Sequence, residues 1–460
     1  MTAEATAASI WDPERLWITI GSVALIFLAA IEALAVTTVM PVISADLDGE
    51  ALYAVAFAAT LATGVIGMVA SGAWSDRSGP RSPLYAAIVL FLVGLVIAGA
   101  APTMDVFLVG RLIQGLGAGG QTVALYVVVA RIYPAHLHGR VFAAFAAAWV
   151  VPSMIGPFLA GAVTQYLHWR WAFLGVAGLV AVAFIMVAIR LRGADLGSGE
   201  GAQGTAHRTG IRLLLATTVA IAAVGIGLAA DVPPGIGWPI ALGALIVLAF
   251  AIMPLLPRGT LRAAIGLPSV VLMRSLIAGA FFSAEAYIPY LLIDRFTFTP
   301  TAAGLALTAS ALAWSGASAV QGRYGERLGN RRISLIAVVL VLVALAGVLA
   351  VASTTGLSPW TVMAVWTLAG AGMGLLYPRL SVLTLAYSSP GNQGFNSSAL
   401  SIADSTGSAV AIALAGLAFG TIAIGSSGFI VVFLFAAALS ALALIPGLRL
   451  GRAAEAAPSS

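Results

Sequence analysis

The segment G-A-W-S-D-R-S-G-P-R, residues 72–81, is a short polar stretch between two long apolar runs. Its pattern returns in G-R-Y-G-E-R-L-G-N-R, residues 322–331, where glycine, acid, arginine, glycine and arginine keep the same offsets. The two copies begin at positions 72 and 322, which are 250 residues apart. The repeat indicates that the chain consists of two related halves.

The composition predicts an all-α polytopic membrane protein. The chain is 61% hydrophobic and 8% charged, whereas soluble domains carry roughly 25% charged residues. A transmembrane helix needs about 20 predominantly apolar residues, and such runs fill the chain almost from end to end. The absence of cysteine excludes disulfides and thiolate metal sites, and the four histidines are expected to form no metal site.

Apolar runs separated by polar breaks predict fourteen spans. They lie at roughly 17–43, 52–74, 83–101, 105–131, 140–165, 169–190, 211–230, 237–256, 268–293, 300–321, 333–352, 359–386, 397–420 and 428–448. The predicted organisation is two six-helix bundles in pseudo-twofold repeat plus two extra helices. Its parts are an N-terminal bundle at 1–192, a cytoplasmic Gly-rich linker at 193–210, two inserted transmembrane helices at 211–257, a C-terminal bundle at 267–450 and a disordered tail at 451–460.

The arginines predict the orientation of these spans. If the N-terminus is cytoplasmic, seventeen arginines fall in inside segments and only Arg170 and Arg295 fall in outside loops. Cytoplasmic loops carry an excess of positive charge, so we expect both termini to be cytoplasmic in a cell (plasma or inner) membrane. The net charge of +5 then needs no nucleic-acid partner.

The repeat extends beyond the polar segment. G-L-G-A-G at 115–119 corresponds to G-A-G-M-G at 370–374, and Glu32 corresponds to Glu285. Parallel repeats with a substrate site at their interface, near the bilayer midplane, are one known plan of secondary transporters. Glycine runs also allow helices to approach closely, and packing is the expected role of each glycine taken alone.

Three acids, Glu32, Glu285 and Asp404, lie well inside predicted spans, as do the cations Arg111, Arg274 and Arg379. A charge at the bilayer centre costs at least about 2.5 kcal/mol, so such residues normally face a bundle interior or an aqueous cavity. We predict that Glu32 pairs with Arg111 and exchanges a proton. Apolar surroundings disfavour the charged carboxylate and a nearby arginine favours it. The alternative is a static ion pair that sets helix register.

Glu285 lies among aromatic residues, which suits a cationic and partly aromatic substrate. It is also a candidate second proton site, or a structural acid. The aromatic candidates for substrate contact beside it are Tyr126, Phe282, Tyr287 and Trp366. Arg379 and Asp404 are predicted to form a gate or structural pair.

The repeated polar segment is predicted to be a conformational latch. Asp76 at a helix end is expected to cap a neighbouring helix and to pair with Arg77 or Arg81, holding one conformation and releasing the other. The alternative is that the arginines only set topology. The predicted latch residues are Gly72, Asp76, Arg77, Gly79, Arg81, Glu326, Arg327 and Arg331.

At this point the motifs resemble those of the major facilitator superfamily, in particular its fourteen-span drug:proton antiporters. Residues 72–81 resemble the loop 2–3 signature, and L-V-G-R-L-I-Q-G-L-G at 108–117 resembles the fourth-helix signature. G-P-F-L-A-G at 156–161 resembles the end of the fifth-helix antiporter motif, and residues 27–41 resemble the first-helix motif of the exporters. The resemblance implies a proton-relay role for Arg111.

The fifth-helix motif contributes Gly156, Pro157 and Gly161. Proline removes a backbone hydrogen bond, so we expect a kink there, as a hinge for rocking or as a simple bend.

We therefore predict a secondary active transporter that couples protons to the efflux of hydrophobic or cationic small molecules by alternating access. Its expected partners are a small-molecule substrate, protons and the lipid bilayer, with no nucleic acid, no cofactor beyond the proton gradient, and a monomeric state. An enzyme is not expected, because no nucleophile–base pair, metal cluster or phosphate loop is recognisable. The alternatives are a dedicated exporter of one endogenous lipid or secondary metabolite and, more remotely, a membrane sensor without flux.

Overall fold

The computed structural model describes residues 12–192, 206–354, 356–388, 393–422 and 427–450. Within these residues fourteen helices are long and apolar enough to cross a membrane, which confirms the predicted number of spans. Residues 206–210, expected at the end of the linker, belong to a helix that starts at Ala206, and the membrane-length apolar segment of that helix starts at Gly210. The rest of the predicted linker and the predicted tail at 451–460 lie outside the described residues.

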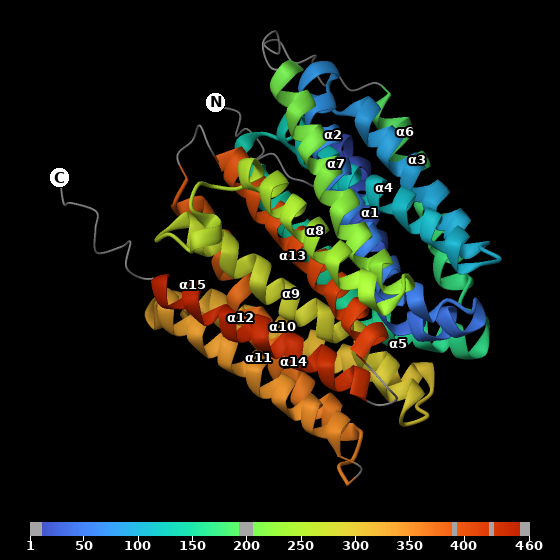
Figure 1. The fold of residues 1–460 in the computed structure, drawn as a ribbon. Coiled ribbons are helices and arrows are strands. Elements are labelled where there is room, and N and C mark those ends of the chain that lie inside the picture. The colour runs from blue at the N-terminus through green and yellow to red at the C-terminus, as the bar shows by residue number, and fades with distance from the viewer. Residues whose placement is uncertain (1–11, 193–205, 355, 389–392, 423–426, 451–460) are drawn as a thin grey trace, which may run out of the picture.

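The helices follow one another without intervening strands in the described residues (Figure 1). The first bundle comprises α1 (Pro13–Asp46), α2 (Tyr53–Ser78), α3 (Arg81–Gly99), α4 (Met104–Ile132), α5 (Ala135–Tyr166) and α6 (Trp171–Leu191). The inserted helices are α7 (Ala206–Leu228) and α8 (Pro234–Ile252). The second bundle comprises α9 (Leu267–Asp294), α10 (Pro300–Leu328), α11 (Asn330–Ser353), α12 (Trp360–Ala386), α13 (Gln393–Ile422), α14 (Ser427–Leu442) and α15 (Leu444–Arg449). Short 3-10 turns lie at Glu50–Leu52, Ala229–Asp231, Met253–Leu255 and Thr260–Arg262.

The number of spans is even, so the described chain begins and ends at the same end of the molecule. We call this the near end, and the opposite end the far end. The two arginines expected outside both have partners at the far end. Arg170 pairs with Asp46, with 3.4 Å between Nη1 and Oδ2, and Arg295 donates to the carbonyl oxygen of Ala352.

The repeated polar segment forms the same turn in both halves. Helix α2 ends at Ser78 and is followed by Gly79, and α10 ends at Leu328 and is followed by Gly329. Both glycines have φ of 76°, a conformation that glycine adopts far more readily than other residues. The glycine at this offset is therefore explained by the turn that starts the next helix.

The glycine runs of α4 and α12 are packing surfaces, as expected from the sequence. A Cβ atom added at Gly119 would overlap the backbone carbonyl of Gly64 in α2. Likewise, one added at Gly370 would overlap the carbonyl of Ser310 in α10. Both halves thus use glycine to bring two helices into backbone contact.

Gly119→Ala is expected to reduce the free energy of unfolding by about 1–3 kcal/mol, because the added methyl group forces α2 and α4 apart. Gly178→Ala in α6 is the matched control, since a Cβ there meets no atom within 4 Å. Titration with SDS in mixed micelles measures both variants. Equal stability of the two would contradict this account of α4.

The inserted helices lie across the junction of the two bundles (Figure 1). Helix α7 packs against α2 of the first half and α13 of the second, and α8 packs against α7. Gly227 of α7 lies against Val55 of α2. Trp238 Nε1 of α8 donates to Thr421 Oγ1 of α13 at 3.1 Å. The hairpin inserted between the halves in sequence therefore contacts both halves in space.

Candidate functional site

The first half contains a buried ion pair between Glu32 of α1 and Arg111 of α4. Each of the two residues is 3% exposed. Arg111 Nη1 donates to Glu32 Oε1 and also to Gln114 Oε1, the latter at 2.7 Å, and Arg111 Nε donates to the carbonyl oxygen of Ala56 in α2 at 3.3 Å. The predicted pairing of Glu32 with Arg111 is confirmed.

Helix α2 holds α4 in position beside this pair. Thr63 Oγ1 donates to the carbonyl oxygen of Leu112 at 2.9 Å, and Thr60 Oγ1 donates to that of Arg111 at 3.3 Å. Both threonines also bond to carbonyls within α2. The sequence analysis assigned no role to Gln114 or to these threonines. The sequence offered one signal for Gln114, namely that it is a polar residue three positions after Arg111 on α4.

The predicted proton exchange at this pair depends on the surroundings of Glu32. A carboxylate beside a guanidinium is stabilised in its charged form, and removing the guanidinium or admitting water changes that balance. With both groups buried, the carboxylate is shielded from solvent in this conformation. Exchange with solvent therefore requires a second conformation in which Glu32 is accessible.

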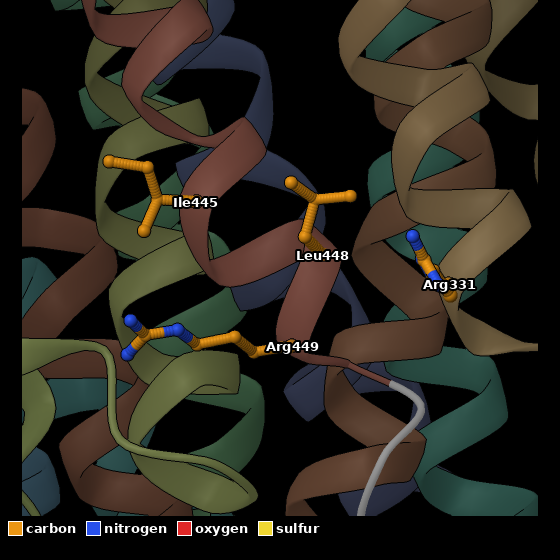
Figure 2. Close-up of a pocket in the computed structure, with 4 residues that line it drawn as sticks. All are labelled: Arg331, Ile445, Leu448 and Arg449. Carbon is orange, nitrogen blue, oxygen red and sulfur yellow. The ribbon is translucent and has the colours of Figure 1, made fainter.

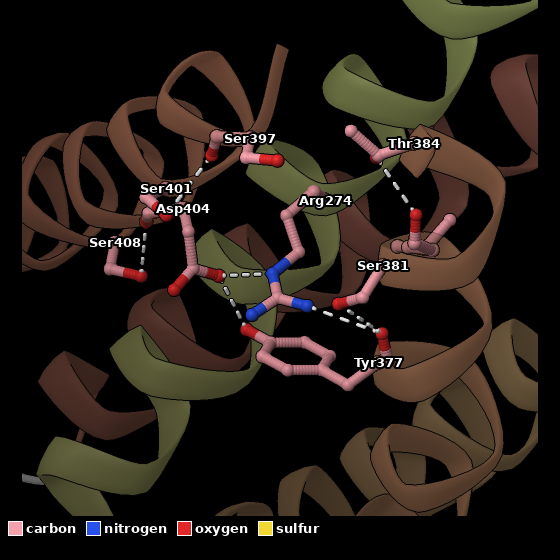
Figure 3. A network of polar contacts seen from close by, with 9 residues as sticks. Arg274, Tyr377, Ser381, Thr384, Ser397, Ser401, Asp404 and Ser408 are labelled. Carbon is pink, nitrogen blue, oxygen red and sulfur yellow. Dashed lines mark hydrogen bonds and ion pairs between the residues drawn. The ribbon is translucent and has the colours of Figure 1, made fainter. Parts of the chain in front are cut away.

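The second half contains a polar network at a different depth, joining α9, α12 and α13 (Figure 3). Arg274 Nε donates to Asp404 Oδ1 at 2.7 Å, and the Tyr377 hydroxyl donates to the same oxygen at 2.8 Å. The Arg274 guanidinium also lies 3.4 Å from the centre of the Tyr377 ring. The Arg274 and Asp404 side chains are 15% and 27% exposed, so this pair is partly open to solvent.

The predicted pair of Arg379 and Asp404 was wrong. Asp404 binds Arg274, whereas Arg379 Nε donates to Asn330 Oδ1 at 2.6 Å. Arg274 was recognised as an embedded cation, but its partner is 130 positions away in sequence and on a helix that is not its neighbour in the chain. Through this hydrogen bond Arg379 of α12 contacts Asn330, the first residue of α11.

Glu285 lies between the network and the aromatic core of the second half. It is half-buried, and it is close enough to Tyr377 for a charge interaction. The indole N–H of Trp366 lies near its carboxylate but forms no hydrogen bond in the structure. Glu285 therefore has no arginine partner of the kind that Glu32 has, within the described residues.

The aromatic candidates for substrate contact divide into two groups. Tyr126 is 47% exposed and stacks on Phe145, and Phe282 is half-buried. Tyr287 and Trp366 are 1% and 0% exposed. Trp366 stacks on Phe281 at 5.0 Å between ring centres. The structure therefore does not offer Tyr287 and Trp366 to a substrate in this conformation.

Tyr287 instead belongs to an aromatic cluster that closes the far end. Tyr53 of α2 contacts the rings of Tyr287 and Tyr290 of α9 at 5.3 and 5.0 Å between centres. The Tyr53 hydroxyl donates to the carbonyl oxygen of Ala286. Tyr53 was not identified from the sequence, because no motif marks it.

Helices α5 and α10 close the far end beside this cluster. A Cβ added at Gly161 would meet the carbonyl of Pro300, and one added at Gly304 would meet that of Pro157. Thr301 Oγ1 donates to Gln165 Oε1 at 2.6 Å. Gly161 and Pro157 of the fifth-helix motif thus lie on the interface between halves, and α5 continues as one helix through Pro157.

Tyr53→Phe is expected to raise the population that is open at the far end about fivefold, because it removes one hydrogen bond worth about 1 kcal/mol. The chain has no cysteine, so spin labels attached at Leu167→Cys and Leu357→Cys, both exposed sites, report the opening as a longer distance. Tyr85→Phe is the control, since that hydroxyl bonds to Ala188 within one half. An unchanged distance distribution in Tyr53→Phe would contradict the assignment.

The predicted contacts of Asp76 are absent in this conformation. Asp76 and Arg77 are exposed, and none of the four ion pairs among the described residues includes Asp76. Helix α3 has no side-chain cap, and Arg81 is half-buried in its first turn. The pairing of Asp76 with Arg77 or Arg81 is therefore corrected, while the latch itself stays a prediction for another conformation.

The second copy of the segment is described only in part. Arg327 is exposed, and Arg331 lines a surface pocket described below. The side chain of Glu326 lies outside the described part of the structure. Among the described residues no group of three histidine or acidic residues could hold a metal ion.

Known proteins resemble this chain in sequence and in fold. The family model of the Major Facilitator Superfamily matches residues 22–284 and again 270–459. A probable multidrug-efflux transporter of Mycobacterium tuberculosis is 26% identical over 401 residues, which cover 84% of this chain and 83% of that protein. An MFS-type transporter of the acurin A biosynthesis cluster of Aspergillus aculeatus is 34% identical over 169 residues, which cover 36% of this chain and 30% of that protein.

Several other curated relatives are matched over only 22% to 30% of their own length. Among solved structures, a POT peptide transporter in complex with alafosfalin superposes with a TM-score of 0.70 at 12% identity, covering 94% of this chain and 95% of that one. The human organic anion transporter MFSD10 superposes with a TM-score of 0.60 at 17% identity, covering 95% and 99%. These structural likenesses concern the fold.

Proposed function

This chain belongs to the Major Facilitator Superfamily, and from that premise we propose that it is a proton-coupled exporter of hydrophobic or cationic small molecules. The proposed cycle alternates access between two bundles, with the proton gradient as the energy source. The observation that carries the proposal is the buried Glu32–Arg111 pair. A transporter has a use for a buried carboxylate that can change charge, and hydrocarbon surroundings make such a group costly otherwise.

The coupling step follows from the contacts of Glu32. In the present conformation Glu32 is paired with Arg111 and closed off from solvent. A conformation that exposes Glu32 to the acidic side allows it to take up a proton, after which its attraction to Arg111 is lost. A conformation that opens Glu32 to the opposite side lets the proton leave there, and the buried pair with Arg111 then forms again.

The proposed substrate class rests on the second half and on one relative. Glu285 offers a carboxyl group on α9 near the half-buried ring of Phe282, and an ionised carboxyl group beside an aromatic ring attracts organic cations. The relative that matches most of this chain is described as a probable multidrug-efflux transporter, which supports export of drug-like compounds.

We place the near end in the cytoplasm, because the loops and termini predicted on that side hold seventeen arginines in the sequence, against two in the loops predicted on the other side. The proposed location is the plasma or inner membrane, and the proposed state is a monomer. In this orientation the far-end contacts between the two halves face outward.

The test uses inverted membrane vesicles with an acidified interior and a pH-sensitive dye. Lipophilic cations and neutral drugs are added in turn, and we expect proton leakage on addition of a substrate to the wild type. Glu285→Gln should lose the response to cations and keep that to neutral compounds if this acid binds substrate charge. Glu285→Asp, which keeps the charge, is the control.

No proton movement with any compound, from folded and inserted protein, would overturn proton-coupled multidrug export. A dedicated exporter of one endogenous lipid or secondary metabolite is the second candidate, and the relative named for the acurin A biosynthesis cluster supports it. That candidate predicts a response to one compound class only, found in extracts of the producing cells.

A further inference from the structure

The near end of the second bundle contains a pocket of about 320 Å³ that no part of the proposed transport cycle uses. Four residues line it, namely Arg331, Ile445, Leu448 and Arg449 (Figure 2). Arg331 is the second residue of α11, and the other three belong to α15. The pocket thus joins two cationic and two aliphatic side chains at the membrane boundary.

The two arginines have no carboxylate partner. None of the four ion pairs among the described residues includes Arg331 or Arg449. Arg449 Nη1 donates to the carbonyl oxygens of Arg262 and Ala263, which fixes the direction of its side chain. A guanidinium has five N–H donors, so most of those on Arg449 remain for another acceptor.

The neighbouring loop adds positive charge. A second pocket of about 290 Å³ is lined by Met253 and residues 256–262, including Arg258 and Arg262. The Arg449 bond to the carbonyl oxygen of Arg262 connects the two pockets. Helix α11 begins at Asn330 without a side-chain cap, and a helix N-terminus favours negative charge. All of these groups favour the same ligand, an anion.

The aliphatic residues identify what else the ligand must carry. Ile445 and Leu448 are 48% and 42% exposed, on a helix that continues the last membrane span. A free phosphate would cover neither of them. A lipid places a phosphate at the boundary and an acyl chain beside the span, which satisfies both halves of the pocket.

We infer that this pocket binds an anionic phospholipid, with its phosphate at the remaining N–H donors of Arg449 and an acyl chain over Ile445 and Leu448, while Arg331 on the other side of Leu448 adds positive charge (Figure 2). Arginine binds phosphate through paired N–H donors, and basic pockets beside membrane helices are suited to anionic head groups. The leaflet follows from the proposed orientation and would be the cytoplasmic one. Binding itself does not depend on the proposed substrate or on proton coupling.

The test is native mass spectrometry of the delipidated full chain with phosphatidylglycerol or phosphatidylcholine of identical acyl chains. We expect phosphatidylglycerol to be retained preferentially. Each arginine near a membrane surface contributes enough that its removal weakens binding about fivefold, so Arg331→Gln/Arg449→Gln should lose about thirtyfold. Arg332→Gln, an exposed neighbour outside the pocket with the same change of charge, should bind as the wild type does.

A competition experiment and two single variants complete the test. Millimolar glycerol phosphate should fail to displace the lipid, and successful displacement would overturn the lipid assignment in favour of a free anion. If Arg449→Gln does not fold, Arg331→Gln and Leu448→Asn test the two parts of the pocket separately. Equal retention of the two lipids, or unchanged binding in the double variant, would overturn the inference. The vesicle assay is independent, so its failure leaves this result standing.

Discussion

Replacing Glu32 with glutamine is expected to abolish substrate-dependent proton movement in inverted vesicles while the protein still binds substrate. Glutamine keeps an oxygen that can accept from Arg111, so the contacts of α1 with α4 survive. It cannot take up or release a proton. Loss of a positioned proton-transfer group reduces rates on the order of a hundredfold or more, which places the variant at the background of the assay.

Variants of Arg111, the partner of Glu32, separate the effect on proton coupling from the effect on folding. Arg111→Gln leaves the Glu32 carboxylate buried without a compensating charge, which is expected to cost about 3–5 kcal/mol of the free energy of unfolding. The double variant Glu32→Gln/Arg111→Gln should recover most of that stability, because neither charge remains, and should still fail to move protons. SDS titration and the vesicle assay measure the two properties.

Substrate binding by Glu32→Gln, followed through tryptophan fluorescence, confirms that the protein is intact. Wild-type proton movement in Glu32→Gln would show that the pair is a static element that sets the register of α1 against α4. If Glu32→Gln neither binds substrate nor resists SDS, it cannot test coupling. Glu32→Asp, which keeps the titratable group, then takes its place.

Replacing Arg274 with methionine is expected to lower the free energy of unfolding by about 2–4 kcal/mol. The change removes the charge-assisted bond to Asp404 and the contact with the Tyr377 ring. Asp404 then keeps only the Tyr377 hydroxyl as a side-chain partner. The loss stays below that of a fully buried pair, because Asp404 is 27% exposed and water reaches it.

Arg15→Met provides the matched control in SDS titration. Arg15 pairs with Asp12 three residues away, at 2.9 Å, and both side chains are more exposed than those of the Arg274 pair. Exposed ion pairs contribute roughly 0–1 kcal/mol. A double-mutant cycle with Asp404→Asn should return a coupling energy of about 1–2 kcal/mol. If Arg274→Met and Arg15→Met lower the free energy of unfolding equally, the network of Arg274, Asp404 and Tyr377 does not stabilise the contact between α9 and α13.

The sequence predicted the fold almost completely because the bilayer restricts it. Apolar length and polar breaks led to fourteen spans, and the offset of 250 residues between residues 72–81 and 322–331 led to two related halves. In a membrane each span must be a helix that satisfies its own backbone, so local composition is sufficient to define it. The repeated glycine is likewise explained, because the turns at Gly79 and Gly329 require positive φ.

The candidate site was only partly predictable, because pairing depends on which helices meet. Glu32 and Arg111 were identified because both are costly charges in spans of the same half, and they pair. Asp404 was assigned to Arg379, which lies at a similar depth, whereas it binds Arg274 on α9. Depth along a span can be read from sequence, but the direction in which a side chain leaves its helix toward a neighbour cannot.

The sequence by itself determined the membrane class, the number of spans, the duplicated halves and the embedded charges, since these follow from hydropathy and from the cost of a charge in hydrocarbon. Only the tertiary structure decided which charges pair, that Tyr53 of one half donates to Ala286 of the other, and that α7 contacts both α2 and α13. These contacts join residues far apart in the sequence, 79 positions for Glu32 and Arg111 and 233 for Tyr53 and Ala286. Helix packing chooses them through side-chain shape and rotation about the helix axis. No local pattern encodes that choice.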